Sequence, residues 1–260
     1  GGRVKTFLTG AAPINLEILE FFHGAGFTIL EVYGLSETSA IAFANAPGPG
    51  MIRLGSVGKA LPGVQCRLAA DGEVLLKGPS IFTGYLNRPD ATAEAFDADG
   101  WFRTGDIGAL DADGFLTLTD RKKNLIKTAG GKYVAPARVE ALVKEEPLVS
   151  QVYVHGDQRP CIVALVTLDE RETGRVAEEL GCAEGDLPTH PEVTRRVQAA
   201  VDGANRRLAR FEQIKRHAVL AHDFSIEDRT LTPTLKIKRN EVAARHASDI
   251  DALYADGGVR

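Results

Sequence analysis

Alternating apolar and polar positions divide the chain into stretches of different character. Residues 4–8 alternate and predict a strand. Asn15 is placed to cap a helix that Gly24 ends, and residues 27–33 predict a second strand. The apolar side of that helix consists of Leu16, Leu19 and Phe22. Strand, helix and strand joined by short links indicate the end of an α/β layered sheet.

From Gly55 to about Arg121 the pattern changes to short β segments separated by Gly and Pro. Two such segments cover 63–68 and 72–77. A hairpin is predicted from 107–110 and 115–119, which flank the turn Asp111-Ala112-Asp113-Gly114. We therefore expect a β-rich, barrel-like region.

Beyond Arg121 the pattern becomes α+β. A helix is predicted over 136–145, strands over 149–155 and 161–168, and a long helix from Glu192. One stripe of the long helix consists of Val193, Val197, Val201, Ala204, Leu208 and Phe211. We place a domain boundary near residue 122, with one domain over 1–122 and a second over 123–260.

Composition narrows the function classes. The 260 residues include 31 basic and 35 acidic side chains, so a net charge of −4 does not favour a nucleic-acid partner. Three cysteines (Cys66, Cys161 and Cys182) form neither a disulfide framework nor a ligand-spaced metal site, which fits a cytoplasmic location. No apolar run is long enough to cross a bilayer. Because the sequence opens with Gly1-Gly2-Arg3 and no initiator Met, we expect it to have been entered midway.

The stretch Tyr33-Gly34-Leu35-Ser36-Glu37-Thr38 follows a predicted strand. Ligands of open α/β sheets bind beyond the carboxyl ends of strands, and this loop offers an aromatic ring, hydroxyls and a carboxylate. These groups suit a nucleotide with magnesium. The alternative is an ordinary polar loop whose Ser and Thr cap a helix.

Two further stretches offer charged groups. Asp106 ends Trp101-Phe102-Arg103-Thr104-Gly105-Asp106, and its carboxylate could accept hydrogen bonds from ribose hydroxyls, or simply belong to a turn. Arg121 could contact a phosphate or ribose, or be a surface arginine. Lys236 lies in the stretch 231–239, which by itself is most simply a solvated cationic segment.

Taken together, these motifs resemble in order and spacing those of the adenylate-forming superfamily of acyl-CoA synthetases, peptide-synthetase adenylation domains and luciferases. The resemblance covers essentially the whole chain. The matching stretches are Tyr33–Thr38 (adenine and magnesium), Gly72–Pro79 with Gly84-Tyr85 (a structural β motif), Trp101–Asp106 (ribose), Asp120–Lys127 (hinge) and Pro233–Arg239 (catalytic lysine).

The resemblance implies a role for each matching residue. The adenine site would comprise Tyr33, Gly34 and the loop Gly10-Ala11-Ala12, which is usually richer in Gly. Glu37 would hold Mg²⁺, Thr38 would contact the α-phosphate, and Asp106 with Arg121 would bind the ribose. Lys236 would bridge the substrate carboxylate and the nucleotide. The hinge and the CoA face would comprise Lys123, Lys127, Gly130 and Gly131, although the two glycines equally suit a tight turn.

The resemblance also implies fold and activity: the later part of a large AMP-binding domain, followed by a complete small α+β domain that rotates between half-reactions. The stretches 120–136 and 231–239 look like those of long-chain fatty acid–CoA ligases, which use ATP, Mg²⁺ and CoA. The family's phosphate-binding loop should precede residue 1, so we expect this piece to be inactive alone. Alternatives are an acyl-AMP ligase that loads a carrier protein, an aryl or medium-chain acyl-CoA ligase, and an independent nucleotide-binding module.

The arginines of the long helix leave one more alternative open. Arg195, Arg196, Arg206, Arg207 and Arg210 fall away from its apolar stripe. A solvated face explains them most simply. Contact with CoA phosphates or peripheral contact with an anionic membrane is the alternative.

Overall fold

The computed structural model describes residues 2–11 and 14–255. The chain divides into two compact units, Gly1–Lys123 and Asn124–Arg260. Among the helices described, none has the length and apolar character needed to span a membrane.

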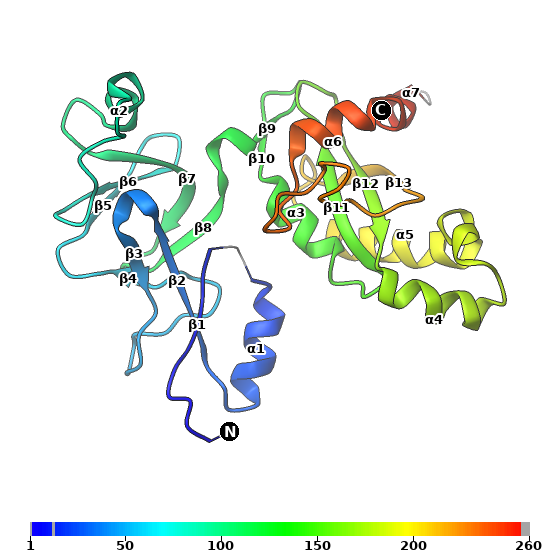
Figure 1. Cartoon of the computed structure of the whole chain (residues 1–260), viewed down its shortest axis with the longest axis horizontal. Helices are drawn as coiled ribbons and strands as arrows, with labels where there is room; N and C mark the ends of the chain where they lie inside the picture. The colour runs from blue at the N-terminus through cyan, green and yellow to red at the C-terminus, as the bar shows by residue number, and fades with distance from the viewer. Residues whose placement is uncertain (1, 12–13, 256–260) are drawn as a thin grey trace. The chain divides into compact units, whose positions relative to one another are not determined.

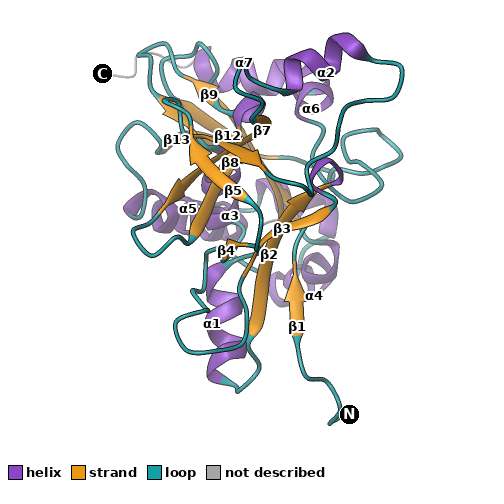
Figure 2. Ribbon diagram, turned by 90° about the vertical axis from the view of Figure 1, so that its left-hand side faces the viewer, coloured by secondary structure: helices purple, strands orange, loops and turns teal. Residues whose placement is uncertain are grey.

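The first sheet of the N-terminal unit has the order β1-β2-β3-β4, with β1 parallel to β2 and the other pairs antiparallel. Its elements are β1 (Phe7–Thr9), α1 (Leu16–Gly24), β2 (Ile29–Leu35), the 3₁₀ turn η1 (Ser36–Thr38), β3 (Ala40–Ala44) and β4 (Lys59–Ala60). Figure 2 shows β1 beside β2, with α1 connecting them. The predicted cap is confirmed, because Asn15 Oδ1 accepts a hydrogen bond from the Glu17 N–H at 2.9 Å. On the apolar side of α1, Leu19 is buried whereas Leu16 and Phe22 are exposed.

The second sheet is antiparallel, with the order β5-β6-β7-β8. Its elements are β5 (Gln65–Leu68), β6 (Glu73–Lys77), α2 (Pro89–Ala95), β7 (Phe102–Leu110) and β8 (Leu116–Arg121). The predicted hairpin is confirmed, since Asp111 Oδ1 accepts hydrogen bonds from the N–H groups of Asp113 and Phe115 at its turn. The β-rich expectation is confirmed, but no closed barrel forms within the described residues. The segment leading into β8 meets the start of β4 through a bridge between Lys59 and Phe115, and apolar side chains of both sheets pack into one shared core.

The C-terminal unit surrounds a three-stranded sheet, β11-β12-β13, in which β11 is antiparallel and β13 parallel to β12. Its elements are β9 (Ile126–Lys127), β10 (Tyr133–Val134), α3 (Pro136–Val143), β11 (Val149–His155), β12 (Ile162–Leu168), α4 (Glu170–Leu180), η3 (Glu184–Thr189), α5 (Pro191–Arg206), β13 (Ile214–Val219), α6 (Arg239–Arg245) and α7 (Ala247–Ala255). A 3₁₀ turn, η2 (Lys122–Asn124), joins the two units.

Helices cover both faces of this sheet (Figure 1). Val152 and Val154 of β11 pack with α3, α4 and α5, whereas Tyr153, on the opposite face, packs with α6 and α7. Successive side chains of a strand point to opposite faces, so a strand buried on both faces must be apolar throughout. This explains why every residue of β12 is buried, including Thr167.

The long helix was predicted to extend further than it does. It ends at Arg206, so Leu208 is buried beyond its end and Phe211 is 43% exposed. A new strand, β13, begins at Ile214. Several arginines of this region are ion-paired: Arg195 with Glu192, Arg196 with Glu192 and Glu179, and Arg207 with Glu145. These pairs favour the solvated-face interpretation.

Candidate functional site

Three predicted site residues meet around one carboxylate in the N-terminal unit. Asp106 is only 6% exposed. Its Oδ2 accepts a hydrogen bond of 2.6 Å from the Tyr33 hydroxyl, and its Oδ1 lies 3.1 Å from Arg121 Nε. The sheets dictate this meeting, because Asp106 on β7 is directly opposite Arg121 on β8, while Tyr33 reaches them from β2.

Burial and hydrogen bonding oppose each other at this carboxylate. Burial raises the pKa of Asp106, and the bonds from Tyr33 and Arg121 counteract that rise. Burial, with the nearby Asp106 charge, also raises the pKa of Tyr33, so the phenol remains a hydrogen-bond donor. Each carboxylate oxygen accepts about two hydrogen bonds. Asp106 therefore retains acceptor capacity for donors such as vicinal hydroxyls.

The loop after β1 begins beside β2. Thr9 pairs with Glu31, and Gly10 lies against the next residue of β2, Val32. A Cβ on Gly10 would lie 2.9 Å from Val32 Cγ2, which explains the glycine. Ala11 adopts φ +65°, a conformation that favours glycine. The predicted site residue Ala12 lies outside the described residues.

The turn after β2 presents Glu37 but conceals Thr38. A Cβ on Gly34 would lie 1.6 Å from the Ala40 carbonyl oxygen, so only glycine permits this tight return. Thr38 is 0% exposed, and its hydroxyl accepts from the Leu35 N–H and lies within hydrogen-bond distance of the carbonyls of Leu35 and Ala40. Its hydroxyl therefore holds the turn in this structure. The predicted contact with an α-phosphate stays a prediction.

The Glu37 carboxylate is a candidate ligand for a Mg²⁺ ion that nucleotide phosphates would also bind. The Tyr85 hydroxyl donates a 2.8 Å hydrogen bond to Glu37 Oε1, the first of its two carboxylate oxygens. Over residues 2–11 and 14–255 no group of three His, Cys, Asp or Glu side chains could enclose a metal by itself. Mg²⁺ commonly takes one or two protein carboxylates together with substrate phosphates, and Glu37 fits that arrangement.

The predicted hinge and CoA residues lie on either side of the unit boundary. Lys123 is exposed in η2 and is the last residue of the N-terminal unit. Lys127 is exposed in β9, with Nζ 5.8 Å from the centroid of the Tyr133 ring. Gly130 and Gly131 form the exposed tip of the β9–β10 hairpin, where Gly131 adopts φ +73°. The tight-turn interpretation therefore holds for these glycines, and a role toward CoA remains a prediction.

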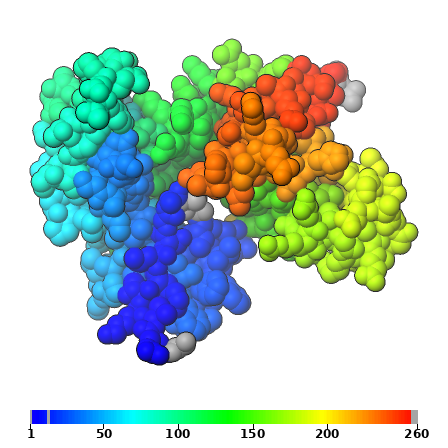
Figure 3. Space-filling model, viewed as in Figure 1, coloured from blue at the N-terminus to red at the C-terminus, as the bar shows by residue number. Residues whose placement is uncertain are grey.

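Lys236 is exposed at the end of a small turn in the C-terminal unit. The Thr232 N–H donates to the Lys236 carbonyl at 2.8 Å, and the Lys236 N–H donates to Thr232 Oγ1 at 3.0 Å. Leu235, before it, is 63% exposed and adopts φ +59°. Residues 233–236 are exposed at the surface of their unit, in the part coloured orange in Figure 3. Shortly after the turn, Arg239 pairs with Glu140 at 2.7 Å and donates to the Val154 carbonyl, which fixes the segment to the core.

Two residues near the site had no role in the sequence-based prediction. Glu31 precedes Tyr33 on β2; its Oε2 accepts from the Gly55 N–H at 2.7 Å, and burial raises its pKa to about 7. In the sequence, Glu31 could have been noticed because it is a charged residue within the apolar run 29–33. Tyr85 belonged to a motif considered only structural, and nothing in the sequence indicates its bond to Glu37.

Family models of AMP-binding enzymes match both units of the chain. The family model described as AMP-binding enzyme C-terminal domain matches residues 123–257, and the one described as AMP-binding enzyme matches residues 1–86. The chain is 46% identical to long-chain-fatty-acid–CoA ligase FadD15 of Mycobacterium bovis, over 98% of this chain and 42% of that protein. It is 39% identical to long-chain-fatty-acid–CoA ligase ACSBG1 of Bos taurus, over 95% of this chain and 37% of that protein. It thus spans less than half the length of these relatives.

Solved structures also superpose on this chain over most of its length. The adenylation domain of a carboxylate reductase from Mycobacterium chelonae superposes with a TM-score of 0.77 at 28% identity, covering 98% of this chain and 39% of that one. O-succinylbenzoate coenzyme A synthetase from Bacillus subtilis, in complex with ATP and magnesium ion, gives 0.70 at 27% identity, covering 92% and 46%. With a family model matching more than half of its residues, the chain belongs to the AMP-binding enzymes.

Proposed function

We propose that this chain takes part in the ATP-dependent activation of a long-chain fatty acid as acyl-AMP and in its transfer to CoA. The observation that supports this most is the buried Asp106 carboxylate, which Tyr33 and Arg121 hold with acceptor capacity left over. The names of the relatives at 46% and 39% identity support the substrate class.

The N-terminal unit would bind the nucleotide. Asp106 would accept hydrogen bonds from the ribose hydroxyls, with Arg121 close by. Tyr33 and Gly34, with the backbone of Gly10 and Ala11, would form the adenine side of the pocket. Glu37 would be the protein ligand to Mg²⁺, which neutralises phosphate charge when bound.

Lys236 would serve the first half-reaction. An oxygen of the fatty acid carboxylate attacks the α-phosphorus of ATP, and the bond to pyrophosphate breaks as the acyl-phosphate bond forms. Negative charge accumulates around phosphorus, and an ammonium beside it stabilises the transition state. In the second half-reaction the CoA thiol attacks the acyl carbonyl, loses its proton and displaces AMP. We propose the unit after the hinge residue Lys123 as the smaller mobile domain, with Lys127, Gly130 and Gly131 on the face that receives CoA.

A panel assay tests this function on the complete enzyme that contains this chain. Medium-chain, long-chain and aryl acids are supplied with ATP and Mg²⁺, and CoA or a carrier protein is offered separately. Acyl-AMP, pyrophosphate and thioester products are measured by mass spectrometry and phosphate detection. Long-chain acyl-CoA is the expected product, and acyl-AMP without CoA thioester would overturn it.

A second candidate has one specific observation in its favour. The chain also superposes, with a TM-score of 0.75 at 28% identity, on an A-PCP didomain of carboxylic acid reductase from Segniliparus rugosus, covering 98% of this chain and 35% of that one. Transfer of the acyl group to a carrier protein is therefore the alternative. Thioester formed on the carrier protein but not on CoA would establish it.

A further inference from the structure

The turn that presents Glu37 is held by one neighbouring segment, residues 80–85. Ser39 Oγ donates to the Ser80 carbonyl at 2.8 Å. The Phe82 N–H donates to the Glu37 carbonyl at 2.8 Å, and the Tyr85 hydroxyl donates to Glu37 Oε1 at 2.8 Å. Glu37 is thus fixed at both its backbone and its carboxylate by the same short segment.

The Tyr85 ring is held in place by contacts with neighbouring aromatic rings. It meets the Phe82 ring edge to face, with centroids 4.8 Å apart. The Phe82 ring in turn contacts the rings of Phe96 and the buried Phe102, with centroid distances of 5.6 and 5.4 Å. The Tyr85 ring therefore packs against an aromatic cluster that extends into the core, and this packing fixes the orientation of its hydroxyl.

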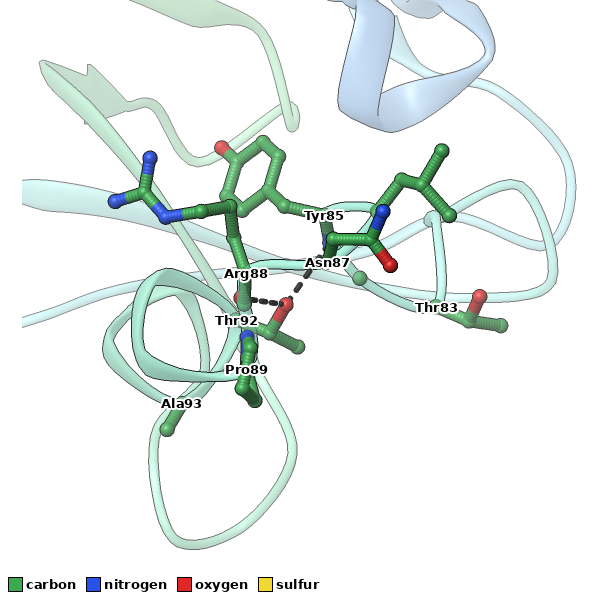
Figure 4. Close-up of a pocket in the computed structure, with 9 residues that line it drawn as sticks. Thr83, Tyr85, Asn87, Arg88, Pro89, Thr92 and Ala93 are labelled. Atoms are coloured by element: carbon green, nitrogen blue, oxygen red, sulfur yellow. Dashed lines mark hydrogen bonds between the residues drawn. The ribbon is translucent and has the colours of Figure 1, made fainter.

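The backbone of Tyr85 is anchored as well. Its N–H donates to Thr92 Oγ1 at 2.9 Å, and that hydroxyl donates to the Arg88 carbonyl at 2.8 Å (Figure 4). Gly84 adopts φ +154°, and a Cβ there would lie 2.7 Å from Thr92 Cγ2. Only glycine lets α2 approach this closely. The segment also lines an open cavity of about 660 Å³, so the phenol lies at the edge of accessible space.

We propose that Tyr85 is a positioning residue for the carboxylate assigned to Mg²⁺: its hydroxyl donates to Oε1 of Glu37 and holds the carboxylate in the orientation in which it would bind the metal. The inference rests on the proposed function, in which Glu37 is the ligand. A hydrogen bond to an ionised carboxylate is stronger than one between neutral groups, and partners that orient metal ligands affect metal affinity by about 10–100-fold.

The test is the Mg²⁺ dependence of acyl-AMP formation by the complete enzyme that contains this chain. Tyr85→Phe keeps the ring on Phe82 and removes only the hydroxyl. We expect the Mg²⁺ concentration for half-maximal rate to rise about 10-fold, with the melting temperature unchanged. Ser39→Ala is the matched control, because it removes a hydroxyl from the same contact without touching the carboxylate, and it should shift half-saturation less than about twofold.

Two outcomes would overturn the positioning role: Tyr85→Phe could leave half-saturation unchanged, or both variants could shift it equally. Calorimetry of Mg²⁺ binding in the presence of ATP gives a readout that does not depend on turnover. In that measurement Tyr85→Phe should weaken Mg²⁺ binding by the same factor, and Ser39→Ala should not.

Glu37→Gln also separates this inference from the proposed function. If Glu37→Gln raises the Mg²⁺ requirement and Tyr85→Phe does not, the positioning role is wrong and the metal role of Glu37 stands. If Glu37→Gln leaves the Mg²⁺ requirement unchanged, the proposed role of Glu37 is wrong, and the positioning role is wrong with it.

Discussion

Asp106 and Lys236 are assigned to the same reaction, but their surroundings differ in almost every respect. Asp106 is buried in the N-terminal unit, opposite Arg121 in a sheet and bonded to Tyr33. Lys236 is exposed at a turn of the C-terminal unit, and the turn is fixed to the core by flanking residues such as Leu231 and Arg239. Groups that bind a ligand gain from being ordered before it arrives, because the entropy of ordering is then lost on folding. The buried carboxylate meets that condition, whereas the exposed lysine would meet its proposed substrate at the surface of its unit.

Replacing Lys236 should have the largest effect on catalysis. Lys236→Ala removes an ammonium assigned to the transition state, so acyl-AMP formation by the complete enzyme should fall by about 10²–10³-fold. Transfer from supplied acyl-AMP to CoA should be spared. The exposed side chain should leave the melting temperature unaltered. Equal loss of both half-reactions would contradict the role, and Lys215→Ala, an exposed lysine on β13, controls for lost charge.

Replacing Asp106 should weaken binding rather than the chemical step. Asp106→Asn keeps an acceptor for Tyr33 but removes the charge opposite Arg121. We expect the ATP dissociation constant to rise about 10-fold or more, because hydrogen bonds to charged groups contribute about 1.5–3 kcal/mol. Isothermal titration calorimetry measures this, with the exposed Asp113→Asn as control. Unchanged affinity would remove Asp106 from the nucleotide site.

The N-terminal unit should also show a pH-dependent stability through Glu31. Burial raises the pKa of this group from 4.5 to about 7, so the native state binds the proton more tightly than the unfolded chain. Its contribution is therefore complete below pH 4.5 and is lost as the pH rises through 7. Glu31→Gln should raise the melting temperature at pH 8 by about 2–4 °C and have little effect at pH 5. A constant difference between variant and parent across this range would refute the assignment, and exposed Glu20→Gln should show no pH trend.

The smallest effects should come from the backbone beside each site. Ala11 and Leu235 both have positive φ, +65° and +59°, next to proposed functional residues. Left-handed geometry destabilises the folded state by about 1–2 kcal/mol for a residue with a Cβ. Glycine avoids this cost, but its greater freedom in the unfolded chain offsets about 0.4–1 kcal/mol of the gain. Ala11→Gly and Leu235→Gly should thus stabilise their units by up to about 1 kcal/mol in denaturant titrations. Ala25→Gly, at φ −80°, should instead destabilise. Destabilisation by Ala11→Gly would mean that its side chain makes a needed contact.

Local features of the fold were predictable from short-range chemistry. The Asn15 cap and the Asp111 turn each depend on hydrogen bonds within four residues, and the stripe Val193, Val197 and Val201 follows helical periodicity. Phe211 was assigned to that helix wrongly, because an apolar period continues past the point where the chain turns to form β13. The β-rich region was predicted correctly, but the sequence did not show whether its sheet closes, because closure does not follow from the spacing of strands along the chain.

The sequence by itself determined the order of the motifs, the family they resemble and the residue types available for chemistry, because these depend on identity and spacing along the chain. Tertiary structure alone decided which of them meet. It brought Tyr33, Asp106 and Arg121 from three strands to one point, and it gave Tyr85 a bond to a carboxylate 48 residues away. It also enclosed Thr38, whose hydroxyl the sequence left available to a phosphate. Contacts between distant residues depend on strand pairing and core packing across the whole unit, and no local pattern records them.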